Sequence, residues 1–326
     1  MSTDPDATPR PVASEPGVVV AVDIGGTKTA VALVDRSGRI VARDEASTPG
    51  QDGPDAILGT VLRLAHALIA AAPGPVRGVG VGTAGVVDTT TGRIVSSTDT
   101  LAGWPGTDVA GALRAGLTAA IGPVPVHVQN DVDAFAAGEV RYGAATGCRS
   151  ALVLAVGTGV GAAVVLDGHV RRGAHHVAGE IAHAPVAGAD HLRCPCGRYG
   201  HLEAIGSGVG LHRHFASLGG SAGDGREVAQ RAASGDPLAV RAVTDSGAAV
   251  GRAIAAAVTV LDPECVVVSG SVAVAGSLWW DAMDAAMRAQ LVDVLHDLPL
   301  RPGSLGADAP LQGAAASVWD CVEEDA

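Results

Sequence analysis

One pattern occurs twice in this chain, and it constrains the fold more than any other feature. Residues 18–35, VVVAVDIGGTKTAVALVD, form an apolar β-branched run, a glycine turn and a second apolar run that ends in aspartate. Residues 151–168, ALVLAVGTGVGAAVVLDG, repeat that order. Each segment predicts two β-strands joined by a glycine-rich turn. A repeated hairpin predicts a duplicated architecture with a cleft between the halves, although any two glycine-rich hairpins look alike at this level.

The segments between and after these hairpins alternate between helix and strand patterns. Residues 57–72 have apolar residues at helical spacing and stop before a Pro-Gly-Pro turn, and residues 76–88 then predict a strand that runs into a loop. The class is therefore α/β. The remaining predicted elements are a strand entering a helix over 124–139, one or two helices over 237–263, a strand entering a glycine loop over 264–276, and a closing helix over 310–322.

Composition excludes several classes of protein. A chain of 326 residues is long enough for two domains. A net charge of −12 and an aromatic content of 2% disfavour nucleic acid as a partner. No apolar run is long enough to span a membrane, and residues 1–16 lack the apolar core of a secretory signal, so we expect a disordered tail there. Five scattered cysteines do not form a disulfide framework, so we expect a soluble, cytoplasmic protein.

The first glycine turn has the chemistry of a phosphate cradle. Asp23 stands at the strand end, Gly25 and Gly26 allow backbone N–H groups to approach an anion, and Thr27 and Lys28 add donors. The segment is not a Walker loop, because the spacing of that motif is absent. The alternative is an ordinary tight hairpin.

The second glycine turn is expected to serve the same phosphates from the other side. Residues 156–161, VGTGVG, have G-x-G-x-G spacing and are followed by a strand, whereas a dinucleotide fingerprint requires a helix there, so we reject NAD. Gly157, Thr158 and Gly159 instead form a hairpin that can face the first one. Two such turns would hold a polyphosphate between them.

A candidate catalytic carboxylate lies at the junction of a predicted strand and helix. Asn130 and Asp131 follow the strand of residues 124–129. A carboxylate at the C-terminal end of a strand in an α/β cleft is well placed to accept a proton from a bound hydroxyl. The alternative is that one of the two residues is merely the N-cap of the helix, which is the commonest role of such residues there.

The segment CPCGRYGHLE (194–203) offers ligands for a metal. Cys194 and Cys196 lack the two-residue spacer of thioredoxin-like redox pairs. With His201 and His183 they supply four sulfur or nitrogen donors, which suits a closed, structural zinc site. The alternative is a pair of unpaired thiols beside surface histidines. Other histidines compete as ligands, namely His175, His176 and His191.

Taken together, these motifs resemble those of the ROK family of sugar kinases. That resemblance implies a duplicated actin-like, ribonuclease H-like ATPase fold with two lobes and a central cleft. It extends from Val18 to about Val318. It is carried by seven segments in the family's order: DIGGTK (23–28), GTAGVVD (82–88), NDVDAFAAGE (130–139), GTGVGA (157–162), GEIAH (179–183), CPCGRYGHLE (194–203) and SLGADAPLQGAA (304–315).

The resemblance implies a division of the chain and a role for each motif. A small N-terminal lobe would cover 17–123 and be closed by the helix of 310–322, and a larger lobe with the zinc knuckle would cover 124–309. The implied ligands are ATP, Mg²⁺, a structural Zn²⁺ and a hexose, with a homodimer as the assembly. By family position, Asp131 is the catalytic base. The resemblance implies that Asn130, Glu180 and Glu203 bind sugar hydroxyls. It implies that the glycines and threonines of 25–27 and 157–159 bind phosphates, that Asp23 binds Mg²⁺, and that His183 binds zinc beside the sugar.

Four departures from the family pattern concern the sugar side and the metal. His201 replaces the third cysteine of the family's zinc motif, and we expect zinc to persist as a His₂Cys₂ site. Ala84 replaces the proline of the loop that ends in Gly85, Ala182 replaces a glycine, and Thr100 replaces an asparagine before LAGW. We expect Gly85 and Thr100 to border the sugar pocket.

The expected substrate is a hexose. The alternative is a sugar-sensing regulator that has no catalytic activity. Glucose is the first choice, and N-acetylmannosamine or N-acetylglucosamine is the alternative. ROK proteins also include sugar-sensing regulators with an N-terminal helix-turn-helix. Here only residues 1–17 precede the first predicted strand, which is too few for that motif, so we expect no direct DNA binding.

Overall fold

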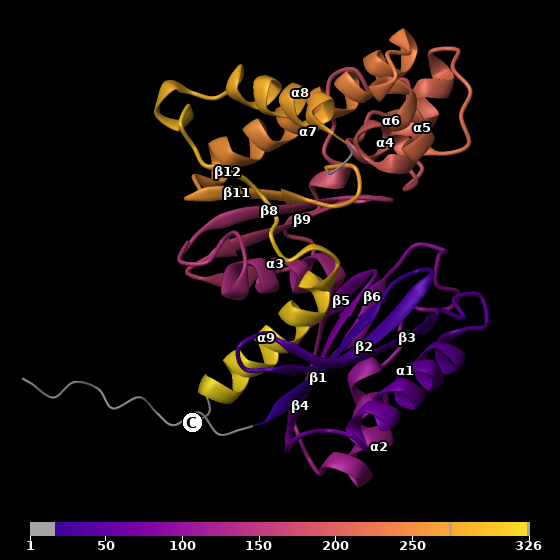
Figure 1. The fold of residues 1–326 in the computed structure, drawn as a ribbon, viewed down its shortest axis with the longest axis vertical. Coiled ribbons are helices and arrows are strands. Elements are labelled where there is room, and N and C mark those ends of the chain that lie inside the picture. The colour runs from indigo at the N-terminus through magenta and orange to yellow at the C-terminus, as the bar shows by residue number, and fades with distance from the viewer. Residues whose placement is uncertain (1–16, 274–275, 325–326) are drawn as a thin grey trace, which may run out of the picture.

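The computed structural model describes residues 17–273 and 276–324, and its first lobe is built on a five-stranded sheet (Figure 1). The strand order is β3-β2-β1-β4-β7, in which β1, β2 and β3 are antiparallel neighbours and β4 and β7 run parallel to β1. Its strands are β1 (Val18–Ile24), β2 (Lys28–Asp35), β3 (Ile40–Ser47), β4 (Val76–Thr83) and β7 (Val126–Asn130).

The second lobe repeats this arrangement. Its order is β10-β9-β8-β11-β12, again with three antiparallel neighbours followed by two parallel strands. The duplication predicted from the two hairpins is therefore confirmed at the level of the whole sheet. The strands are β8 (Ala151–Val156), β9 (Val160–Leu166), β10 (His169–Arg171), β11 (Cys265–Ser269) and β12 (Leu300–Pro302).

Helices cover both sheets, and α3 (Asp131–Tyr142) and α9 (Ala309–Glu324) lie between them (Figure 1). On the first sheet, alternate residues of β1 enter different cores: Val20 and Val22 pack with α1 (Pro54–Ile69) and α2 (Val109–Ile121), whereas Val19 and Ala21 pack with α9. On the second sheet, α7 (Pro237–Leu261) and α8 (Ser277–Arg288) cover the outer face, and α3 covers the inner one.

Shorter elements complete the described chain. A two-stranded sheet is formed by β5 (Val86–Asp88) and β6 (Arg93–Ser96). The helices α4 (Glu203–Gly206), α5 (Gly208–Ser217) and α6 (Gly225–Ala233) follow one another in the second lobe, and 3₁₀ turns occupy Ile181–His183, Asp293–Leu295 and Gly306–Asp308. Among the described residues, no helix combines the length and apolarity that a membrane crossing requires.

Glycines bring α3 and α9 unusually close. A Cβ placed on Gly313 would lie 1.6 Å from the Ala134 carbonyl oxygen, and one on Gly138 would lie 2.6 Å from the Ala309 carbonyl oxygen. Any larger residue at either position would force the helices apart. Since Asp131 begins α3, this contact also sets where that carboxylate lies.

The structure corrects or refines the sequence-based elements at three points. The pattern predicted no strand between residues 36 and 56, yet β3 is present as a charged edge strand. For the segment 237–263 the sequence left one or two helices open, and the structure has one continuous helix, α7. The lobe boundary at 123 and 124 remains a prediction, but the first sheet continues past it, because β7 pairs with β4.

Candidate active site

The junction of β7 and α3 shows how Asn130 is used. Its Oδ1 accepts hydrogen bonds from the backbone N–H groups of Val132 at 2.8 Å and Asp133 at 3.4 Å, so Asn130 is the N-cap of α3. Its Nδ2 donates to the Gly85 carbonyl oxygen at 3.0 Å. The capping alternative therefore holds for Asn130, and its proposed contact with sugar remains a prediction.

Asp131 is left free of the capping role. It is the first residue of α3, and its Oδ1 accepts a hydrogen bond from the Val132 N–H at 3.0 Å. Burial among surrounding protein raises the pKa of Asp131, against the lowering effect of its hydrogen bonds. The N-terminus of a helix favours a negative charge, while burial makes that carboxylate a stronger base. This combination suits proton abstraction from an alcohol.

Asp23 lies near Asp131, although the two residues belong to different elements. Burial, followed by the negative charge of Asp131, raises the pKa of Asp23 to about 7, against the opposing effect of Lys28 and Arg43. The two carboxyl groups repel each other, and a divalent cation bound beside them would relieve that repulsion. Oxygen donors of this kind suit Mg²⁺.

Lys28 is engaged elsewhere than the sequence predicted. Its Nζ pairs with Glu45 Oε2 at 3.2 Å, and both side chains are about half exposed. Glu45 lies on β3, the edge strand that the sequence analysis missed. Lys28 is therefore held at the edge of the first sheet, and its contact with a phosphate remains a prediction.

The two glycine turns have the predicted hairpin form. In the first, the Gly25 N–H donates to the Lys28 carbonyl at 3.0 Å, and in the second the Gly157 N–H donates to the Gly159 carbonyl at 2.8 Å. The second turn is tied to the start of α5, because the Gly208 N–H donates to the Gly157 carbonyl at 2.8 Å. Both turns stand at the ends of the strands that lead to the site.

Thr100 approaches the first turn closely. A Cβ on Gly26 would lie 2.3 Å from Thr100 Cγ2, so only glycine fits beneath this threonine as the chain stands. The Gln51 Nε2 donates to the Thr100 carbonyl at 3.3 Å, and the Thr98 and Thr100 hydroxyls are 3.1 Å apart. The loop that contains Thr100 therefore packs against Gly26 of the first glycine turn.

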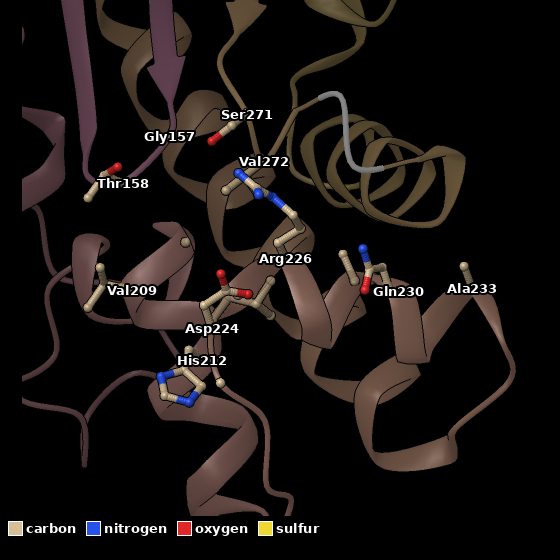
Figure 2. A pocket seen from close by; sticks show the side chains of 15 residues that line it. Gly157, Thr158, Val209, His212, Asp224, Arg226, Gln230, Ala233, Ser271 and Val272 are labelled. Atoms are coloured by element: carbon tan, nitrogen blue, oxygen red, sulfur yellow. The ribbon is translucent and has the colours of Figure 1, made fainter. Parts of the chain in front are cut away.

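A cavity of about 670 Å³ opens beside the second turn. It is bounded by Gly157 and Thr158, by the N-terminal turns of α5 and α6, and by Ser271 after β11. Figure 2 shows Arg226 extending from α6 towards Ser271 and Val272. The glycine loop after β11 was predicted, but Arg226 and Gln230 carry no motif, so the sequence could not indicate them.

The acidic residues expected to hold a sugar form one group with His183. His183 Nε2 lies 3.8 Å from Glu180 Oε2. Burial raises the pKa of both Glu180 and Glu203, while His183 opposes both shifts. The group adjoins the second turn, since a Cβ on Gly159 would lie 3.3 Å from Glu203 Oε1. The charge of Asp131 also acts on Glu180, so Asp131 lies near this group.

The four predicted metal ligands come together. The ligand atoms of His183, Cys194, Cys196 and His201 all lie within 4.8 Å of one another. Cys194 Sγ is 3.7 Å from His183 Nδ1, and Cys196 Sγ is 3.2 Å from His201 Nδ1. The two sulfur–nitrogen separations are close to the edge of a tetrahedron around a zinc ion, and two thiols with two imidazoles are a donor set that suits that metal. The competing histidines 175, 176 and 191 do not belong to this cluster.

A buried polar network behind Asp131 was missed by the sequence analysis. Arg172 Nε lies 3.5 Å from Asp133 Oδ2, and Arg172 Nη2 donates to Gln129 Oε1 at 2.7 Å. Burial raises the pKa of Asp133 to about 6, against the opposing charge of Arg172. Arg172 follows β10 of the second sheet while Gln129 lies in β7 of the first, so this network joins the lobes. Only tertiary contacts reveal it.

Comparisons with known proteins identify relatives over nearly the whole chain. A family model described as the ROK family matches residues 19–320. The bifunctional enzyme NanE/NanK of Brucella melitensis is 35% identical over 303 residues, which are 91% of this chain and 53% of that protein. The chain thus spans about half the length of that relative. An N-acetylmannosamine kinase of Salmonella paratyphi A is 33% identical over 258 residues, covering 78% of this chain and 84% of that protein.

Two solved structures have the same fold. A ROK hexokinase from Thermus thermophilus superposes with a TM-score of 0.83 at 32% identity, covering 94% of this chain and 99% of that one. A ROK family glucokinase from Streptomyces griseus, solved with glucose and AMPPNP, superposes with a TM-score of 0.78 at 28% identity, covering 93% and 100%. The duplicated actin-like ATPase fold expected from the sequence is therefore confirmed.

Proposed function

This chain belongs to the ROK family, and we propose that it is a kinase that transfers the γ-phosphoryl group of ATP to a hydroxyl of a hexose. The observation that carries the proposal is the position of Asp131. A carboxylate with a raised pKa starts α3, its charge acts on both Asp23 and Glu180, and it takes no part in capping the helix. In this role Asp131 accepts the proton of the sugar hydroxyl as the hydroxyl oxygen attacks the γ-phosphorus.

The rest of the site supplies alignment and charge compensation, which are the main requirements of phosphoryl transfer. The backbone N–H groups of the two glycine turns, with Thr27 and Thr158, bind the phosphates. The cavity beside the second turn accommodates the nucleoside, with Arg226 and Gln230 along its wall. Glu180 and Glu203 bind sugar hydroxyls.

Two metal ions belong to the proposal. Asp23 would hold Mg²⁺, which neutralises phosphate charge when bound. The cluster of His183, Cys194, Cys196 and His201 would hold a structural Zn²⁺, which cross-links the loop when bound. With Nδ1 of His183 directed to the thiolates, its Nε2 remains beside Glu180, so the knuckle orients a residue of the sugar pocket.

Glucose is the proposed substrate, and N-acetylmannosamine is the second candidate. The glucokinase structure that contains glucose supports the first choice. The identity to an N-acetylmannosamine kinase and the small side chains Ala84 and Thr100 at the sugar side support the second. These two substrates differ in bulk at one position of the ring, so the pocket must distinguish a hydroxyl from an acetamido group.

A coupled assay of ADP release tests the proposal. Glucose, N-acetylmannosamine, N-acetylglucosamine, mannose, fructose and allose are compared with the unaltered protein and with Asp131→Asn. We expect turnover with glucose, and a loss of about 10²- to 10⁴-fold in kcat for Asp131→Asn with a much smaller change in KM. Asp281→Asn, an exposed position on α8, is the matched control and should be unchanged.

Two outcomes would contradict the proposal. Unchanged turnover in Asp131→Asn would remove this residue from proton transfer. Absence of turnover with every sugar, together with sugar binding measured by calorimetry, would favour a sugar-sensing protein without catalysis.

A further inference from the structure

A second cavity, of about 430 Å³, lies in the second lobe apart from the proposed site. Its walls come from four places: the loop that precedes the cysteines, α4, α5 with the residue after it, and α7. The ionisable side chains that line it are basic in excess, namely His191, His214, Arg241 and Arg252 against Asp245.

His214 and Asp245 both line this cavity. His214 is 4% exposed, and its Nε2 lies 2.9 Å from Asp245 Oδ2. Since a carboxylate only accepts, Nε2 carries the hydrogen. The other nitrogen, Nδ1, is buried and has no hydrogen-bond partner among the residues that the structure describes. A buried polar atom of this kind is costly unless a ligand pairs with it.

The arginines differ in how far they are already neutralised. Arg241 Nε lies 3.7 Å from Asp245 Oδ2, so Asp245 serves both Arg241 and His214. Arg252 Nη2 donates to the Ala187 carbonyl oxygen at 2.9 Å, and its Nε is buried without a hydrogen-bond partner in the described part of the chain. The guanidinium of Arg252 is therefore the group that keeps donor capacity for an anion.

We propose that this cavity binds a phosphate group, either inorganic phosphate or the phosphate of a small monoester. A guanidinium fork matches the paired oxygens of phosphate, which a spherical anion does not offer. Phosphate also suits either state of His214, because its oxygens accept from a protonated Nδ1 and its own hydroxyl donates to a neutral one. This proposal does not depend on the proposed hexose phosphorylation.

The cavity is lined by residues of the elements that also carry residues of the proposed site. Ile205, which lines it, is two residues from Glu203 on α4, and His191 stands in the same loop as Cys194. A phosphate bound in the cavity would therefore contact elements that also carry Glu203 and Cys194.

Calorimetric titration of the full-length protein with inorganic phosphate, at constant ionic strength, tests the proposal. Besides any binding at the glycine turns of the proposed nucleotide site, we expect one further site, with an affinity about 10- to 100-fold weaker in Arg252→Gln and an intermediate affinity in Arg252→Lys. The control is Arg226→Gln, which removes the same charge from the large cavity of the proposed nucleotide site and should leave the affinity of that further site unchanged. Titration with glucose 6-phosphate distinguishes a monoester from free phosphate: competition for the Arg252-dependent site identifies the monoester.

Two results would overturn the proposal. One is the absence of phosphate binding at millimolar concentrations, and the other is binding that Arg226→Gln abolishes and Arg252→Gln preserves. If Arg252→Gln does not fold, arsenate soaked into crystals of the unaltered protein gives the answer. Its anomalous signal should lie between Arg252 and His214, and a signal only at the glycine turns would exclude the site.

Discussion

At the scale of single residues, Gly26 and Thr100 offer a sharp test of the first glycine turn. A Cβ on Gly26 would meet the Thr100 methyl group, an atom that serine lacks. We therefore expect Gly26→Ala to lower kcat/KM for ATP about tenfold, because the turn or the Thr100 loop must shift. The double variant Gly26→Ala with Thr100→Ser should recover most of that loss.

The measurement is a double-mutant cycle on initial rates, with Thr100→Ser alone as the control. Additive losses in the double variant would mean that the methyl group is not the obstacle. In that case the requirement for glycine would come from the phosphate itself.

Asp23 gives a prediction about stability and pH. Its raised pKa, about 7, means that the folded state binds this proton more tightly than the unfolded state does. The contribution of Asp23 to stability should therefore be lost as pH rises from about 4 to about 7. Asp23→Asn lacks this loss, so its advantage in unfolding free energy should grow by about 4 kcal/mol across the same range.

Urea unfolding at several pH values, with EDTA present, measures this difference, and Asp281→Asn is the control. Addition of Mg²⁺ at pH 8 should then stabilise the unaltered protein more than Asp23→Asn. If the unfolding free energy depends on pH in the same way in both proteins, the pKa of Asp23 is not raised in the folded state.

At the scale of elements, the sequence indicated buried strands more readily than exposed ones. β1, β2, β8 and β9 are apolar runs closed by glycine turns, so their pattern predicts them. β3 reads IVARDEAS and was missed, because an edge strand faces solvent and is held by backbone pairing to β2 rather than by apolar burial. That omission also hid Glu45, the partner of Lys28.

The site was predictable only where chemistry follows local spacing. The glycine turns, Asp131 and the cysteine and histidine ligands all stand in short recognisable segments. Arg226, and the contact of Arg172 with Asp133, have no such signal, because their meaning depends on which elements the fold brings together. The sequence also left open whether Asn130 or Asp131 caps α3. Only the geometry of the structure assigns the N-cap to Asn130.

The prediction of a zinc site concerns the loop that carries Cys194 and Cys196. We expect about one zinc ion per chain by mass spectrometry of the purified protein, and loss of that zinc in Cys194→Ser. His201→Cys, which restores the family's ligand, should keep the metal and release it more slowly to a chelator. Protein purified without zinc, with intact folding by circular dichroism, would refute the metal site.

At the scale of the whole molecule, the site is assembled from both copies of the duplicated unit. Asp23 and Thr100 belong to the first lobe, Glu180 and Glu203 to the second, and Asp131 starts the helix that lies between the sheets (Figure 1). The close α3–α9 contact and the Arg172 network tie these parts together. In the proposed mechanism, proton abstraction and phosphate binding would therefore depend on the relative position of the lobes.

A crystal structure of this protein with glucose and AMPPNP tests the central claim most directly. The account predicts one carboxylate oxygen of Asp131 at hydrogen-bonding distance, about 2.6–3.2 Å, from the sugar hydroxyl that faces the γ-phosphate. It also predicts the triphosphate between the turns of Gly25–Lys28 and Gly157–Gly159. An Asp131 carboxylate turned away from every sugar oxygen, with another base in contact with that hydroxyl, would contradict it.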